Sequence, residues 1–191
     1  MIFLIAWIVS STIFSVYIFW TYILNPNGQW LLLPDLVHDT SPKLLIFIHF
    51  IGGIVINILG PIQVSSRKYH KQLGKIFIIS SYITSLAGLL FIFVRGTVGG
   101  TIMSMFFFIY GLLMLYYTYN TYYYAVRKDF TKHMIFAIRL LSFTYGSMIY
   151  RLLYTYHYLF NIKVDFRGYY DILCNCLLIV IPYFISTYLT T

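Results

Sequence analysis

The sequence has no glutamate, and its 191 residues include only five aspartates. So few carboxylates exclude a carboxylate-rich metal cage, a hydrolase with paired carboxylates and an acidic disordered tail. Charged residues make up 9% of the chain, whereas soluble domains contain about 25%. The chain is instead 60% hydrophobic and 21% aromatic, with a mean hydropathy of +0.80. A soluble fold of this length could not bury that much apolar surface, so the composition predicts an integral membrane protein.

Cysteine is almost absent, since the chain contains only Cys174 and Cys176. Two residues apart on a helix, these side chains face away from each other, which argues against a disulfide between them. They are interpreted as small buried apolar side chains, and they do not indicate a redox compartment. No set of nucleophile, base and acid can be identified either, which ranks a hydrolase last among the possible functions.

Long apolar runs are abundant, and about 20 such residues form a membrane-spanning helix. Continuous runs also lack the alternation of a membrane β-barrel. The sequence therefore predicts an all-α, polytopic bundle in a single domain, 1–191, with a four-helix core at 45–155 and peripheral helices at 2–24 and 169–189. The six predicted spans are residues 2–24, 44–64, 74–94, 101–124, 133–156 and 169–189.

Basic residues collect in alternate connections between the predicted spans. The second and fourth connections carry net charge +6, and the other three are neutral. Because basic loops stay on the cytoplasmic or matrix-like side, both termini are expected on that side. This topology explains most of the net charge of +8 without a nucleic-acid partner. The sequence predicts a multi-pass protein of the plasma membrane or of an organellar inner membrane, and does not distinguish them.

A few polar residues fall inside or at the ends of the predicted spans, where an ionisable group is costly and marks a function by default. His133 and Arg151 are 18 residues apart and would share one face of a continuous helix. Arg151 is therefore expected to face the bundle interior together with His133. The alternative to a functional role for the arginines is that their side chains snorkel to the interface. The glycine-rich and serine-rich helix faces could likewise serve only the packing of neighbouring helices. The polar residues are His49, Asn57, His70, His133, Arg139, Arg151, His157 and Asn175.

Two histidines, His70 and His133, begin the third and fifth spans on the basic side. Histidine is a common ligand of haem iron, so this pair predicts a b-type haem, with Arg67 and Arg139 close by to bind its propionates. His49 lies toward the other side, where a second haem has less support. The alternative is that these residues bind a lipid, a quinone or a metabolite, or simply close the bundle.

The ordered series of these residues resembles the domain-of-unknown-function family 2306 of predicted membrane proteins. The resemblance covers about residues 45–155 and departs from the usual pattern at Ala137, where a methionine is common. It implies the membrane-helical fold and the site residues but no reaction, because the family has no established activity. Its histidine-bearing bundle is similar to the cytochrome b561 and ferric-reductase type of haem protein. The series is His49, Gly60-Pro61-x-Gln63, Arg67, His70, Gly74, Gly88, His133, Arg139 and Arg151.

Three functions are compatible with these observations. The first is a haem protein that transfers electrons within the membrane to a quinone or another redox partner. The second is a non-catalytic structural subunit of a larger membrane assembly, such as a respiratory complex. The third is a transporter or binder of an anionic lipid or small molecule, although the paired inverted repeats of many transporters are not found. Whether the protein is an enzyme stays open.

Overall fold

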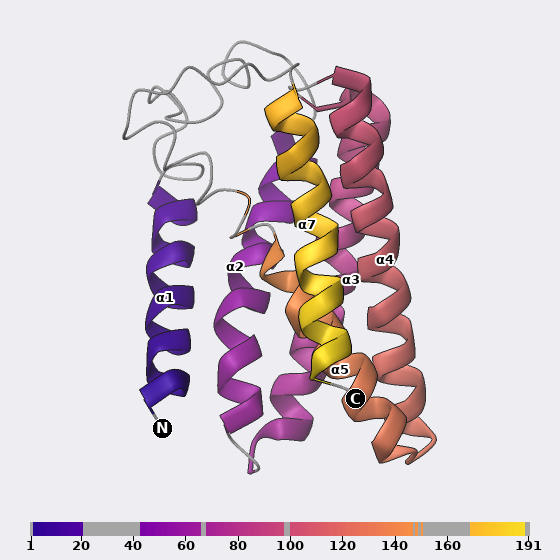
Figure 1. The fold of residues 1–191 in the computed structure, drawn as a ribbon. Coiled ribbons are helices and arrows are strands. Elements are labelled where there is room, and N and C mark those ends of the chain that lie inside the picture. The colour runs from indigo at the N-terminus through magenta and orange to yellow at the C-terminus, as the bar shows by residue number, and fades with distance from the viewer. Residues whose placement is uncertain are drawn as a thin grey trace.

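The computed structural model describes residues 2–20, 43–65, 68–97, 100–146, 148, 150 and 169–189. All of its regular elements in these ranges are helices, as the sequence predicts (Figure 1). They are α1 (Ile2–Ile18), α2 (Lys43–Ser65), α3 (His70–Arg95), α4 (Gly100–Val126), α5 (Phe130–Thr144) and α7 (Tyr169–Tyr188). Among the described residues, three helices are long and apolar enough to cross a membrane, namely Leu44–Ser65, His70–Arg95 and Gly100–Val126.

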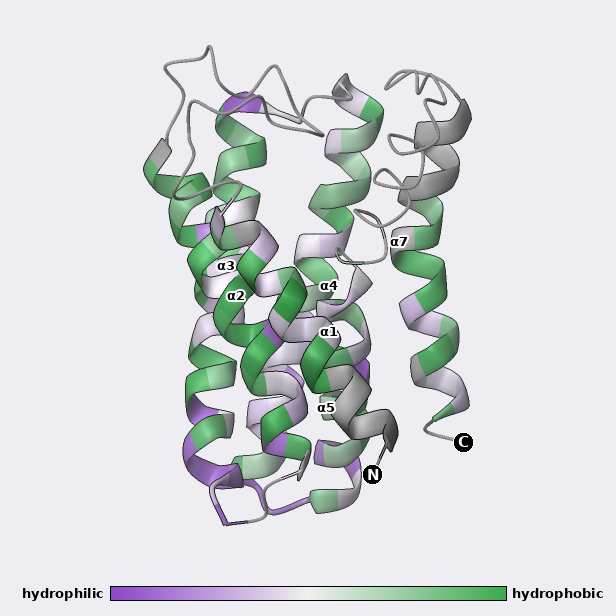
Figure 2. Cartoon of the chain, turned by 90° about the vertical axis from the view of Figure 1, so that its left-hand side faces the viewer, coloured by the Kyte–Doolittle hydropathy of each residue, from purple (hydrophilic) through white to green (hydrophobic). Residues whose placement is uncertain are grey.

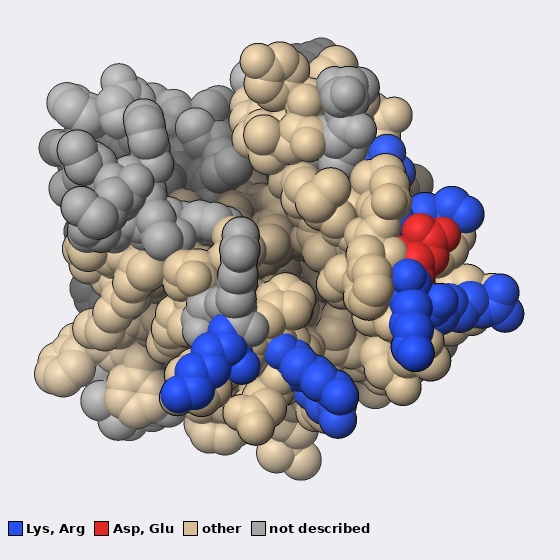
Figure 3. All heavy atoms as spheres, turned by 90° about the horizontal axis from the view of Figure 1, so that it is seen from below, with Lys and Arg blue, Asp and Glu red and all other residues tan. Residues whose placement is uncertain are grey.

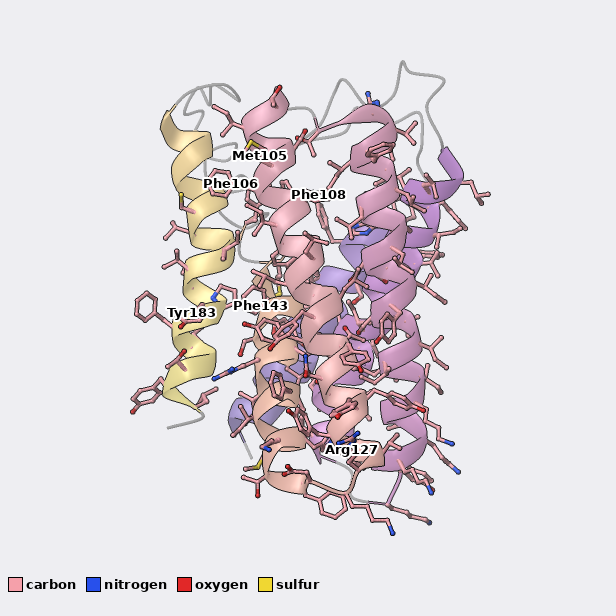
Figure 4. The ribbon with its side chains drawn as sticks, turned by 90° about the vertical axis from the view of Figure 1, so that its right-hand side faces the viewer. Met105, Phe106, Phe108, Arg127, Phe143 and Tyr183 are labelled. Carbon is pink, nitrogen blue, oxygen red and sulfur yellow. The ribbon has the colours of Figure 1, made fainter. Side chains whose placement is uncertain are left out.

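Helices α2 to α5 pack in sequence order, α2 on α3, α3 on α4 and α4 on α5. Helix α1 lies against α2, and α7 lies against α4 and α5. Figure 4 shows Phe143 in the interior of this bundle. The buried cluster between the helices consists of Ile56, Phe77, Met114, Tyr117, Leu140, Leu141 and Phe143.

The outer surface of the bundle is apolar along most of its length (Figure 2). Large side chains such as Phe93 and Phe184 are 84% and 66% exposed. Exposed apolar side chains on every outer face suit contact with lipid tails rather than water. Hydrophilic residues gather at the lower end, where the α2–α3 and α4–α5 connections lie (Figure 2). The start of α1 and the end of α7 lie toward this same end (Figure 1).

Within the predicted fifth span, 133–156, the helix is interrupted at Tyr145, and the described residues Gly146, Met148 and Tyr150 are helical again. Helix α5 begins at Phe130 and ends at Thr144, after 15 residues. It ends because the N–H of Tyr145 donates to the carbonyl of Phe143 rather than to a carbonyl four residues back. The Thr144 hydroxyl also donates to the carbonyl of Leu141 at 2.7 Å.

This interruption bears on one expectation from the sequence, which the described residues do not test. The continuous helix on which His133 and Arg151 were expected to share a face is interrupted after Thr144. Arg151 itself lies outside the described residues, as does His157. Helix α1 is described over Ile2–Ile18, with helical residues continuing to Trp20, and residues 21–24 of the predicted first span lie outside the described residues.

Candidate functional site

The structure brings His70 and His133 together at the basic end of the bundle. Their ring centroids are 6.2 Å apart, and the ring planes are nearly perpendicular, at 83°. His70 is the first residue of α3, and His133 lies in the first turn of α5. These two helices pack mainly on other partners, so the rings meet through the ends of the helices rather than along their lengths.

His133 is positioned by the tight connection between α4 and α5. Lys128 adopts a positive φ of 60°, and the N–H of Asp129 donates back to the carbonyl of Tyr124 at 3.1 Å. This pattern terminates α4 as a Schellman motif does. Asp129 then caps α5, because its carboxylate accepts from the N–H of Lys132 at 3.1 Å. The connection therefore leads directly into the turn that carries His133.

Backbone carbonyls of the neighbouring helices hold both imidazole rings. Nδ1 of His133 lies 2.9 Å from the carbonyl oxygen of Thr121 in α4. Nδ1 of His70 lies 3.1 Å from the carbonyl oxygen of Gln63 in α2. A carbonyl can only accept, so each Nδ1 is the protonated nitrogen. In the neutral imidazole each Nε2 then carries the lone pair, the arrangement found in histidines that bind a metal.

The Gly60-Pro61 pair of α2, just before Gln63, attaches α2 to the end of α5. Proline has no N–H, so the carbonyl of Asn57 loses its donor within the helix. The hydroxyl of Tyr145 donates to this carbonyl at 3.1 Å. A Cβ at Gly60 would lie 3.3 Å from that hydroxyl and 3.0 Å from Leu141 Cδ2, so glycine allows the close approach. The pair thus joins α2 to the end of α5.

His49 lies apart from this pair, within the α2–α3 contact. Its Nδ1 donates to the carbonyl of Thr84 at 2.9 Å. A Cβ at Gly88 would lie 2.8 Å from that nitrogen, so only glycine leaves room for the ring. Among the residues that the structure describes, the buried hydroxyls of Ser81, Thr84 and Ser85 in α3 have no hydrogen-bond partner. His49 and its surroundings therefore form a second polar region inside the bundle.

The predicted arginines are placed differently. Arg139 lies over the ring of Phe136, one turn earlier in α5, at 5.7 Å. Six residues of helix separate it from His133, which corresponds to about 9 Å along the axis and about 120° around it. Arg139 therefore points to a different flank of α5 from His133. Arg67 and Arg151 lie outside the described residues.

The donor set limits what the site can hold. Within the described ranges, no three or more His, Cys, Asp or Glu side chains gather in a group that could hold a metal ion. A closed zinc site of the usual four-ligand kind is therefore not formed by these residues. The His70–His133 pair offers two ring nitrogens, Nε2 of each imidazole.

Sequence reasoning missed the groups that hold these rings. The carbonyls of Gln63 and Thr121 carry no sequence signal, because every residue has a carbonyl. Tyr145 was also missed, but a signal existed: a proline within a predicted span requires a donor from elsewhere. Pro61 therefore predicts that a hydroxyl or amide from another helix approaches Asn57.

These features define a multi-pass helical membrane protein with a pair of histidines at one end. The sequence profile described as "Predicted membrane protein (DUF2306)" matches residues 46–190, and the chain belongs to this family. The match runs through α7 and so extends beyond the expected range of 45–155. No curated protein matches the chain. No solved structure matches it either.

Proposed function

We propose that this chain is a b-type haem protein of the membrane, with His70 and His133 as the two axial ligands, and that it transfers electrons. The observation that carries this proposal is the contact between these two rings, each positioned by a hydrogen bond from its Nδ1 to a backbone carbonyl. A haem held by these two histidines would exchange single electrons without a substrate at the iron.

The separation of the two imidazole rings supports this proposal. Imidazoles on opposite sides of one metal have ring centres roughly 6 Å apart, since each metal–nitrogen bond is about 2 Å. The 6.2 Å between the His70 and His133 centroids agrees with this separation. The nearly perpendicular ring planes are also compatible with two ligands on one metal. Both planes can contain the line that joins the two ligand nitrogens, whatever the angle between the planes.

The residues of the chain have defined tasks in this proposal. The Gln63 and Thr121 carbonyls fix the tautomer and the orientation of the two ligands. Cations at the same end, among them Lys71 and Lys75, would supply positive charge for propionates, a role that the sequence also assigns to Arg67. The sequence assigns this role to Arg139 too, but Arg139 lies on a different flank of α5 from His133. His70 is exposed, so the site reaches the surface where a redox partner exchanges electrons.

The test is the reduced-minus-oxidised spectrum of the full chain, produced with ample haem and purified. We expect a Soret band and the sharp visible bands of a low-spin haem. His70→Ala and His133→Ala should each abolish this signature, because one axial ligand is lost. His49→Ala is the matched control, because the Nδ1 of His49 also donates to a backbone carbonyl. This variant should keep the spectrum of the His70–His133 site.

His70→Met separates lost ligation from lost folding. It should retain haem with a raised reduction potential, as in proteins with one histidine and one methionine ligand. Absence of a Soret band in the unmodified chain overturns the proposal. An unchanged spectrum in both alanine variants overturns the assignment of these ligands.

A further inference from the structure

The lower end of the bundle carries most of the described positive charge. Figure 3 shows the basic side chains of this face with a single acidic residue among those described, Asp129. Asp129 is already engaged, because its carboxylate binds the N–H of Lys132 at 3.1 Å and its ammonium at 3.3 Å. The cations around it are therefore not neutralised within the described residues. They are Lys68, Lys71, Lys75, Arg127 and Lys128, whereas Lys132 is paired with Asp129.

Tyrosine rings support the cations of the α4–α5 connection. The Arg127 guanidinium lies 4.3 Å from the centroid of Tyr123, and the Lys132 ammonium lies 5.3 Å from that of Tyr124. The two tyrosine rings contact each other edge to face at 5.1 Å. Figure 4 shows Arg127 at the lower end of the bundle. Each cation is thus held on an aromatic face, which favours a fixed position over free motion in water.

The depth of these groups points to the membrane surface. Helix α4 is long and apolar enough to cross the membrane, and it ends one residue before Arg127. Tyrosines at the end of such a helix lie at the level of the lipid headgroups. A guanidinium at this depth meets phosphate groups, which its two parallel N–H donors match.

We propose that the α4–α5 connection binds the phosphate of an anionic phospholipid through Arg127 and Lys128, with Tyr123 against the glycerol region. This site is distinct from the His70–His133 pair and does not depend on haem. Charge complementarity selects an anionic over a zwitterionic lipid, because the connection has no uncompensated acid. The cations lie at headgroup depth, which favours a lipid over a soluble acidic protein.

The experiment compares lipid retention by the full purified chain in neutral detergent. Native mass spectrometry would measure binding of phosphatidylglycerol and of phosphatidylcholine with identical acyl chains. We expect preferential binding of phosphatidylglycerol that weakens as ionic strength rises. Each of Arg127→Gln and Lys128→Gln should weaken it about fivefold, and the double variant about twenty-fivefold.

Arg95→Gln is the matched control, because Arg95 also lies over an aromatic ring, 5.8 Å from Phe91, at the other end of the bundle. It should leave the preference unchanged, as should His70→Ala, which separates this site from the proposed haem site. Equal retention of both lipids by the unmodified chain overturns the proposal. So does an undiminished preference in the double variant, or competition by a soluble acidic peptide at equal concentration.

Discussion

At the scale of single residues, the hydroxyl of Tyr145 has a specific energetic role. It donates to the Asn57 carbonyl that Pro61 leaves without a helical partner, and it accepts from the Ser11 hydroxyl at 3.2 Å. Tyr145→Phe should therefore lower the free energy of unfolding by about 1–2 kcal/mol, because a buried carbonyl loses its donor. Chemical unfolding in detergent would measure this loss.

A double-mutant cycle identifies the cause of that loss. Pro61→Ala restores an N–H that can reach the Asn57 carbonyl within α2. In the Pro61→Ala background, Tyr145→Phe should cost at least about 0.5 kcal/mol less than in the unmodified chain. Equal costs in the two backgrounds would show that the tyrosine stabilises the protein by packing alone.

At the scale of helices, the end of α4 is strained. Lys128 has a φ of 60°, a left-handed conformation that costs a residue with a side chain roughly 1–2 kcal/mol. Lys128→Gly should raise the free energy of unfolding by about 0.5–1 kcal/mol, since part of the relief is offset by the greater freedom of glycine in the unfolded chain. Unfolding curves of the two proteins in the same detergent would measure the gain.

The control for this change is Lys128→Ala, which removes the charge and keeps the strain. It should not stabilise the protein. A gain as large as that of the glycine variant would assign the effect to charge repulsion among the basic residues rather than to φ.

Most helices could be predicted because apolar length alone indicates them. The predicted range of 44–64 corresponds to α2 at Lys43–Ser65, and the predicted range of 101–124 lies within α4 at Gly100–Val126. The end of α5 could not be predicted, because the interruption at Tyr145 falls in an apolar run without a nearby proline or charge. The sequence predicts that His70 and His133 meet, because both begin spans on the basic side, but not how they meet, because α3 and α5 pack mainly on other helices.

At the scale of the whole molecule, the two basic connections lie at one end of the bundle (Figure 3). The side of the membrane that this end faces stays a prediction from the charge distribution. Single cysteines would be introduced by Lys68→Cys and Lys128→Cys in a chain with Cys174 and Cys176 replaced by serine. In sealed cells or organelles, both should resist an impermeant maleimide, whereas Thr97→Cys at the other end should react. Labelling of Lys68→Cys and Lys128→Cys from opposite sides would contradict this topology.

The bond between Tyr145 and Asn57 also has a consequence for biosynthesis. Its two partners are 88 residues apart, so the donor emerges from the ribosome long after α2 has formed. Until then, α2 would expose an unsatisfied carbonyl to lipid, which costs several kcal/mol in the hydrocarbon region. The nascent α2 is therefore more stable in a hydrated or protein-lined environment until α5 is complete. The position of Pro61 thus favours the release of α2 into the lipid only after α5 has formed.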